Sequence, residues 1–171
     1  MILATRVCVS PWNMGKFIDD EFVQNNVTLI DIPWDKYSYT QDDPMHFSIS
    51  DYPSFCDDLA QSLRGVPSPL LILTDSTVDE YNDSKMSASN MLENTLLQKC
   101  QIHATVSAVC GSGFMSLAPY HFHAILSKSV RAGNRYASVL FMGGWNDAHN
   151  DQERVCGCVR RACHRAMHIL I

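Results

Sequence analysis

Residues 70–77 read LLILTDST. The first five positions are almost entirely apolar, and the three that follow are small and polar. A short continuous apolar run indicates a strand that is covered on both faces, as parallel strands of α/β proteins are. Side chains that directly follow such a strand lie at the carboxyl edge of the sheet, where α/β proteins bind their ligands. This stretch therefore predicts a parallel sheet with Ser76 at the edge that carries chemistry.

Four other short apolar runs complete the predicted sheet, and helix-like stretches separate the strands. The five expected strands are 2–9, 27–32, 70–74, 103–110 and 136–142. Apolar residues repeat at helical spacing in three intervening segments. These stripes are Phe55, Leu59 and Leu63; Leu92, Leu96 and Cys100; and Val155, Val159, Ala162, Cys163, Ala166 and Leu170. Alternating strands and helices predict an α/β fold with an open parallel sheet between two helical layers.

Composition limits the classes of protein to consider. The chain has 171 residues, 46% of them hydrophobic, and a formal net charge of −5. We expect one domain, 1–171, with enough apolar material for a core and no overall positive charge to bind nucleic acid. No run is long enough to span a membrane, and the start does not resemble a leader peptide. These features predict a cytoplasmic or otherwise intracellular domain. Both ends of the sequence lie in apolar runs, which is what we expect of a domain cut from a larger polypeptide.

The seven cysteines are odd in number and mostly occupy apolar runs, which favours reduced, buried thiols. Cys156, Cys158 and Cys163 lie near His164 and His168, but this spacing matches no common zinc pattern. Structural thiols are therefore preferred to a metal site, and no metal or cofactor is expected.

Three residues have the chemistry of an activated serine. Ser76 needs a base to attack at neutral pH, and His46 is available in the only Asp-x-x-His sequence of the chain, which starts at Asp43. Asp43 would orient the imidazole and stabilise its protonated form. The alternative for Ser76 is that it only caps a helix.

Two further strand ends supply possible donors to an oxyanion. Gly113, or alternatively Gly111, follows the strand at 103–110, and Asn146 follows the strand at 136–142. A backbone N–H and a side-chain amide are the groups that stabilise a tetrahedral intermediate of acyl transfer. The alternatives are a turn at the glycine and a helix cap at the asparagine.

These residues together resemble the sequence blocks of the SGNH (GDSL-type) hydrolases. Residues 74–77, TDST, are similar to the Gly-Asp-Ser-Leu block, with Thr74 in place of its glycine. Residues 110–113, CGSG, resemble the glycine block, and residues 144–147, GWND, match the Gly-x-Asn-Asp block. Residues 43–46, DPMH, resemble the Asp-x-x-His block. The resemblance implies a three-layer, flavodoxin-like fold and a catalytic set of Ser76, His46, Asp43, Gly113 and Asn146.

The order of these blocks differs from that of the family, in which Asp-x-x-His comes last. If Ile171 continued into Met1, the blocks would follow in the family's order. We therefore expect a circular permutant, natural or engineered, in which residues 2 and 171 lie close together. The resemblance also implies a strand order of 103–110, 70–74, 136–142, 2–9 and 27–32, with Ser76 where the order reverses.

The resemblance implies a serine ester hydrolase that acts through an acyl-enzyme. We expect its substrates to be short acyl, acetyl-type esters, because no long apolar surface helix suited to docking on lipid is evident. Acetylated sugars, lysophospholipids and thioesters are alternatives. A binding or scaffold module that keeps the fold without the chemistry is the alternative from another class. The expected partner is a small-molecule ester, without nucleic acid, and the oligomeric state is open.

Other residues allow more than one interpretation. Trp34, Tyr37, Tyr39, Phe114, Met115 and Trp145 either line a substrate pocket or pack in lids and core. Four arginines at 154, 160, 161 and 165 form the one basic cluster, either a solvated face or a contact for an acidic neighbour. His121 and His123 lie in a helix-like run, where we expect their side chains to point to different faces.

Overall fold

The structure is a computed structural model that describes residues 1–6, 16–39, 46–79, 87–115, 121–147 and 150–171. Its strands are β1 (Ile2–Thr5), β2 (Thr28–Ile30), β3 (Leu70–Thr74), β4 (Ala104–Ala108) and β5 (Ser138–Met142). Its α-helices are α1 (Lys16–Gln24), α2 (Tyr52–Ser62), α3 (Ser76–Asp79), α4 (Ala88–Cys100), α5 (Phe122–Arg131) and α6 (Gln152–Met167). Short 3-10 helices lie at Trp34–Lys36, Ile49–Asp51 and Trp145–Asp147.

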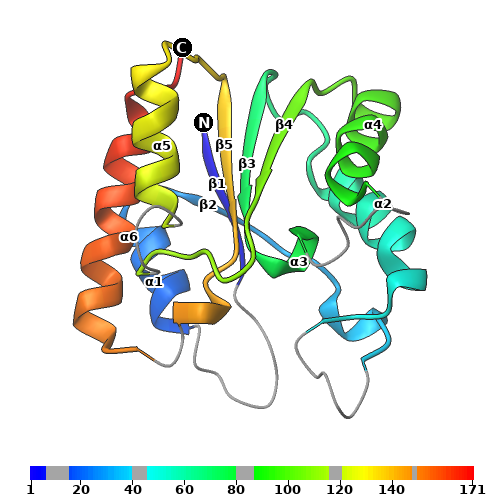
Figure 1. Cartoon of the computed structure of the whole chain (residues 1–171), viewed down its shortest axis with the longest axis horizontal. Helices are drawn as coiled ribbons and strands as arrows, with labels where there is room; N and C mark the ends of the chain where they lie inside the picture. Colours follow the sequence, from blue (N-terminus) through cyan, green and yellow to red (C-terminus); the bar gives the residue numbers. More distant parts are fainter. Residues whose placement is uncertain (7–15, 40–45, 80–86, 116–120, 148–149) are drawn as a thin grey trace.

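The five strands form one sheet in the order β2-β1-β5-β3-β4, and every pairing is parallel (Figure 1). β3 lies between β5 and β4, with Leu71 opposite both Val139 and Thr105. This is the predicted strand order. If the strands are counted along a circle that begins at β3, the sheet order becomes 2-1-3-4-5, which is the flavodoxin-like arrangement.

The two ends of the chain lie beside the segment that leads into β5. The N–H of Ile171 donates to the carbonyl of Tyr136 at 3.0 Å, and the amino group of Met1 donates to the carbonyl of Ala137 at 2.6 Å. These two acceptors belong to consecutive residues, whose Cα atoms are about 3.8 Å apart. The expected closeness of residues 2 and 171 is confirmed, and both ends lie at the amino end of the sheet.

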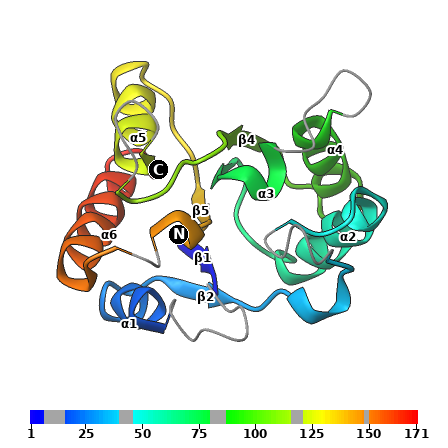
Figure 2. The ribbon, with the colours of Figure 1, turned by 60° about the horizontal axis from the view of Figure 1, so that its bottom comes forward.

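Helices cover both faces of the sheet and complete three layers. α2 and α4 pack on one face, and α1, α5 and α6 pack on the other (Figure 2). Successive residues of β3 point to opposite sides, so Leu70 and Ile72 join the first layer's core and Leu71 and Leu73 join the second. This two-sided burial explains why the central strands are continuously apolar instead of alternating.

The predicted strands are longer than the observed ones, except at 70–74, where the bounds agree. Tyr136 forms only an isolated bridge with Leu170, because its N–H and carbonyl bond the end of the chain. His103 and Val109 lie outside β4, although each extends the pairing by one backbone hydrogen bond with the segment around β3. The residues 7–9 of the first predicted strand lie outside the described part of the chain.

The predicted helical stripes are buried except at two of their last positions, Cys100 and Leu170, which are half-buried, and Leu170 lies beyond the end of α6. Phe55, Leu59 and Leu63 are buried in or directly after α2, and Leu92 and Leu96 are buried in α4. The stripe of α6 from Val155 to Ala166 is buried as well, whereas Arg154, Arg160 and Arg161 are exposed. No helix in the described ranges is long and apolar enough to cross a membrane.

The cysteines agree only partly with the expectation of buried thiols. Cys56 and Cys163 are buried, and burial raises the pKa of each thiol to about 12. Cys100, Cys156 and Cys158 are half-buried, and none of the six described cysteines forms a disulfide. Cys110 is exposed, contrary to expectation, because it follows the end of β4 in a turn instead of lying within the strand.

Candidate functional site

The site lies at the carboxyl ends of β3 and β5, which are neighbours in the sheet. From β3 the chain proceeds through α3 and α4, on one face of the sheet, to β4, whereas after β5 it forms α6 on the opposite face and ends. Such a switch point leaves a crevice at the carboxyl ends of the strands. Ser76 directly follows the buried end of β3, and Asn146 lies shortly after β5.

Ser76 is half-buried at the start of α3, but Asp75 performs the capping there. One carboxylate oxygen of Asp75 accepts hydrogen bonds from the backbone N–H of Thr77 at 3.0 Å and from its hydroxyl at 2.7 Å. An aspartate that accepts from the residue two positions on satisfies one of the first N–H groups of a helix. The hydroxyl of Ser76 is therefore not required as the cap of α3.

His46 comes from a distant part of the sequence, yet its charge acts on Asp75. Burial raises the pKa of Asp75, and the hydrogen bonds from Thr77 and then the charge of His46 oppose this rise. The electrostatic effect of an opposite charge on a carboxylate falls off with distance, so this effect is consistent with His46 lying at the same end of the sheet as Asp75. Asp43, the expected partner of His46, lies outside the described residues.

An aromatic cluster holds the segment that carries His46. Phe47 is buried, forms an antiparallel bridge with Tyr39, and packs on Tyr37, Tyr52 and Phe55. The N–H of Ser48 donates to the carbonyl of Ser38 at 2.7 Å, next to that bridge. Burial of the Phe47 ring contributes about 2 kcal/mol to holding this backbone. The packing of Phe47 therefore restrains the backbone directly after His46.

The loop after β4 is joined to the end of β3 by the carbonyl of Thr74. This carbonyl accepts from the N–H of Val109 at 3.2 Å and from the hydroxyl of Ser112 at 3.0 Å. Ser112 is completely buried, and the carbonyl of Gly113 accepts from the N–H of Phe122 at the start of α5. Gly113 is thereby held at the same sheet edge as Ser76.

Asp147 fixes the other side of this loop. Its two carboxylate oxygens accept from the N–H groups of Phe114 at 2.7 Å and Met115 at 2.8 Å. The carboxylate lies so close to Gly113 that any Cβ there would collide with it. Glycine is therefore required at 113 for packing, and Gly111, which has nothing within 4 Å of a Cβ position, lacks that requirement.

Asn146 is exposed, and its amide is oriented toward the same loop. Its Nδ2 donates to the carbonyl of Ser112 at 2.8 Å, next to Gly113. The interpretation of Asn146 as the cap of the last helix is wrong, because Asp151 caps α6 by accepting from the N–H of Arg154 at 2.9 Å. An amide nitrogen has two hydrogens, so the bond to Ser112 uses one and orients the other.

Asp75 and Asp147 form a pair of buried carboxyl groups beneath the site, each with 1% of its surface exposed. Burial raises the pKa of Asp147, its two backbone hydrogen bonds oppose this rise, and the charge of Asp75 adds to it. Sequence reasoning gave Asp147 no role, although it belongs to the Gly-x-Asn-Asp block. The signal available was its position after Asn146 in residues 144–147.

The aromatic residues proposed as pocket or packing divide between the two roles. Tyr37 is buried, with its hydroxyl donating to Asp58 at 2.8 Å, and Phe114 is buried among Phe22, Phe122 and Phe141. These two are core residues. Tyr39 is exposed, with its hydroxyl donating to the carbonyl of Trp34.

No group of three or more His, Cys, Asp and Glu side chains within the described ranges is arranged to hold a metal ion. Cys163 is buried against the sheet, whereas His164 and His168 are exposed on the other side of α6. The cysteines and histidines of α6 therefore do not converge.

Comparisons with protein-family models, with curated proteins and with solved structures found no match.

Proposed function

We propose that this domain is a serine ester hydrolase of the SGNH type, circularly permuted, that cleaves short acyl esters through an acyl-enzyme. The observation that carries the proposal is the attachment of the Gly113 loop to β3, through Thr74, and to the segment after β5, through Asn146 and Asp147, which gathers the residues of three blocks at one edge of the sheet. A second support is the effect of the His46 charge on the pKa of Asp75, which precedes Ser76.

In the proposed first step, His46 accepts the proton of the Ser76 hydroxyl while the oxygen attacks the ester carbonyl. The carbonyl π bond breaks and places a negative charge on its oxygen. This tetrahedral intermediate collapses as His46 returns the proton to the departing alcohol, which leaves an acyl group on Ser76. Asp43 would orient His46 and balance its charge while it holds the proton.

Three donors are proposed for the oxyanion: the backbone N–H of Ser76, the backbone N–H of Gly113 and the side-chain amide of Asn146. Hydrogen bonds hold two of these donors in place. Asp147 and Ser112 fix the loop that contains Gly113, and the carbonyl of Ser112 in that loop orients the Asn146 amide. Donors that are oriented before the reaction cost no reorganisation during it, and each contributes about 3 kcal/mol to lowering the barrier.

In the second step, water attacks the acyl group with His46 as base, and the carboxylic acid leaves as the proton returns to Ser76. Core packing of Tyr37 and Phe114 removes two candidate walls of a large acyl pocket. This is consistent with a short acyl group.

Hydrolysis of a short chromogenic acyl ester tests the proposal. Ser76→Ala and His46→Ala are each expected to lower kcat/KM by at least about 10³-fold. Ser54→Ala, at an exposed position in α2, and His103→Ala, at an exposed position directly before β4, are matched controls that keep full activity.

A fluorophosphonate probe provides an independent measurement, because it forms a covalent bond only with an activated serine. Labelling of the native chain at Ser76 and its absence in His46→Ala are expected. Ester hydrolysis that persists in both Ser76→Ala and His46→Ala contradicts the proposal, and an unlabelled native chain without hydrolysis favours the scaffold alternative.

A further inference from the structure

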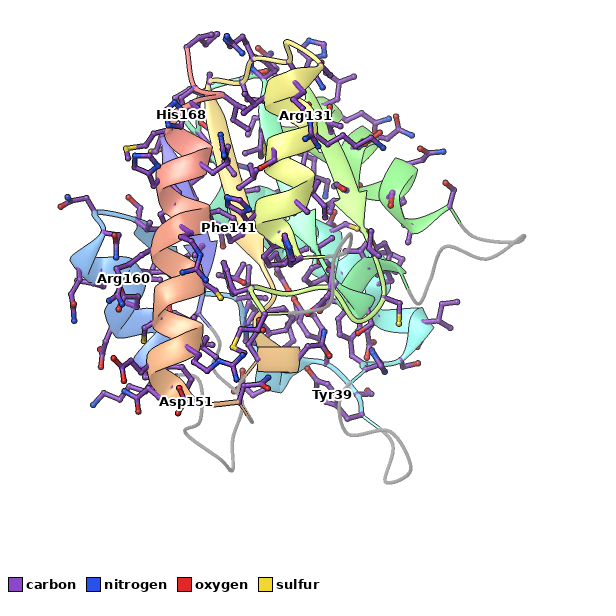
Figure 3. All side chains as sticks on the ribbon, turned by 60° about the vertical axis from the view of Figure 1, so that its left-hand side comes forward. Tyr39, Arg131, Phe141, Asp151, Arg160 and His168 are labelled. Carbon is purple, nitrogen blue, oxygen red and sulfur yellow. The ribbon has the colours of Figure 1, made fainter. Side chains whose placement is uncertain are left out.

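The surface between α5 and α6 contains two adjoining hollows of about 510 and 340 Å³. α5 and α6 run side by side there, with Arg160 on α6 (Figure 3). Both hollows include His123, Arg160 and Arg161 in their walls, so they form one groove, which we call the α5–α6 groove. Volumes of this size are typical of small-molecule sites.

The groove is positively charged in a protein of net charge −5. Its walls contain four guanidinium groups and one carboxylate, that of Glu153. Glu21 beneath the groove pairs with Arg160 at 3.1 Å, which neutralises one more positive charge. An excess of two positive charges remains before any imidazole is protonated. The four guanidinium groups belong to Arg154, Arg160, Arg161 and Arg165.

Two guanidinium groups lie beside Gly157 on the surface of α6. A Cβ at Gly157 would lie 3.6 Å from Nη1 of Arg161 and 3.9 Å from Nη2 of Arg160. Nη2 of Arg161 also donates to the sulfur of Cys158 at 3.0 Å, which restricts its rotation. Restrained guanidinium groups lose less conformational entropy on binding an anion than free ones do.

Two imidazoles face the same groove, and the prediction that they point to different faces is wrong. His121 precedes α5 as its N-cap, in extended backbone, and its ring lies 5.9 Å from that of His123. Nδ1 of His121 accepts the N–H of Ala124 at 2.8 Å, so the proton of the neutral ring is on Nε2. Burial, followed by the charges of Arg165, His121 and Arg161, lowers the pKa of His123. The arginines thus act on the imidazole across the groove.

The inner wall of the groove is apolar. Phe114 and Met115 contribute to the larger hollow, and Met115 is half-buried. The groove therefore combines guanidinium and imidazole donors with a small apolar surface, which fits an anion attached to an organic group.

We propose that the α5–α6 groove binds a small organic phosphate monoester. A phosphate dianion matches the excess of two positive charges, and its three oxygens accept bidentate hydrogen bonds from guanidinium groups. A carboxylate or a sulfate monoester carries only half of this charge. The described walls include no exposed Phe, Tyr or Trp ring on which a base would stack, and the net charge of the chain opposes a long polyanion.

Calorimetric titration of the whole chain with phenyl phosphate tests the proposal, with phenyl sulfate and inorganic phosphate as comparisons. We expect saturable binding of phenyl phosphate at one site, several-fold tighter than that of either comparison ligand. Arg161→Gln is expected to weaken it about tenfold, since one charge-assisted pair is lost. Arg131→Gln, at the far end of α5 and outside the groove walls, is the matched control and leaves binding unchanged (Figure 3).

Two additional measurements keep the result interpretable. Arg154→Gln provides a second groove variant if Arg161→Gln does not fold, and it is expected to weaken binding in the same direction. Ser76→Ala is expected to bind phenyl phosphate as the native chain does, which separates the groove from the proposed ester site.

Each of the following outcomes overturns the proposal. The first is the absence of saturable binding of phenyl phosphate, and the second is an equal loss of affinity in Arg161→Gln and Arg131→Gln. The third is loss of binding in Ser76→Ala. The fourth is tighter binding of inorganic phosphate or of a single-stranded oligonucleotide than of phenyl phosphate.

Discussion

The two ends of the sheet use their buried polar groups differently. At the carboxyl end, Asp75, Ser112 and Asp147 are buried and shape a rim from three strand ends. At the amino end, backbone hydrogen bonds to Tyr136 and Ala137 hold the two chain ends. Side chains thus connect the strand ends at the carboxyl end, whereas backbone groups hold the termini at the amino end. We therefore expect a change of connectivity at the amino end to be tolerated better than a change of side chain at the rim.

The largest expected effect is on catalysis at the rim. Asn146→Ala removes one proposed oxyanion donor and is expected to lower kcat by at least 10²-fold, about 3 kcal/mol of barrier. Asn134→Ala, an exposed asparagine at the amino end, is expected to leave kcat unchanged. Steady-state hydrolysis of a short acyl ester measures both, and equal rates in the two variants would remove Asn146 from the mechanism.

A pair of glycines compares the packing of the two ends. Gly113→Ala forces a Cβ into the Asp147 carboxylate and is expected to lower the free energy of unfolding by about 3 kcal/mol. Gly133→Ala meets open space but has a φ of +74°, which costs only about 1 kcal/mol. Urea denaturation of both variants checks the order, and a larger loss for Gly133→Ala would contradict the close approach at the rim.

The buried carboxyl group of Asp75 gives the rim a pH dependence. Because its pKa is raised in the folded state, folding binds a proton that the unfolded chain has already released. This contribution to stability is therefore lost as the pH rises from the ordinary carboxyl range through the raised pKa. Across that pH window, the free energy of unfolding of Asp75→Asn is expected to depend less on pH than that of the native chain. Denaturation at several pH values measures the difference, and parallel profiles would contradict it.

Two buried hydroxyls provide a smaller comparison. Within the described residues, the hydroxyls of Thr74, at the rim, and Ser138, at the amino end, are buried without a hydrogen-bond partner. Thr74→Val and Ser138→Ala are each expected to be neutral or stabilising by up to about 1 kcal/mol, because an unsatisfied polar group is removed. Thermal melts measure this, and a loss above 1 kcal/mol in either variant would indicate a partner for that hydroxyl.

The smallest effect is expected from a change of connectivity. The tested chain has Ile171 joined to Met1 by a short glycine-serine linker and is opened between the exposed residues Pro67 and Ser68, so that it begins just before β3. We expect the same circular dichroism spectrum and an ester activity within about threefold of that of the native chain. A collapse of stability would show that the amino end depends on more than backbone pairing.

The sequence allowed prediction of the features that depend on local pattern. The continuous apolar run at 70–74 is a buried strand with those bounds, and the stripe from Val155 to Ala166 is the buried face of α6. The strand order followed from a resemblance, since local patterns contain no information about which strands are neighbours.

The sequence did not predict features that depend on distant contacts. The approach of Asp147 to Gly113 joins residues 34 apart, and neither residue alone indicates it. The convergence of His121 and His123 was missed because helical spacing was applied to His121, whose backbone is still extended. The roles of Ser76, His46 and Asn146 in hydrolysis stay predictions, and Asp43 lies outside the described residues.

Attachment of both chain ends beside Tyr136 and Ala137 has a practical consequence for handling the molecule. A fluorescent protein, an affinity handle or a solid support fused to either terminus would extend from the pole opposite Ser76. Immobilised copies would thus present the carboxyl end of the sheet, with Ser76, outward, whichever terminus is anchored.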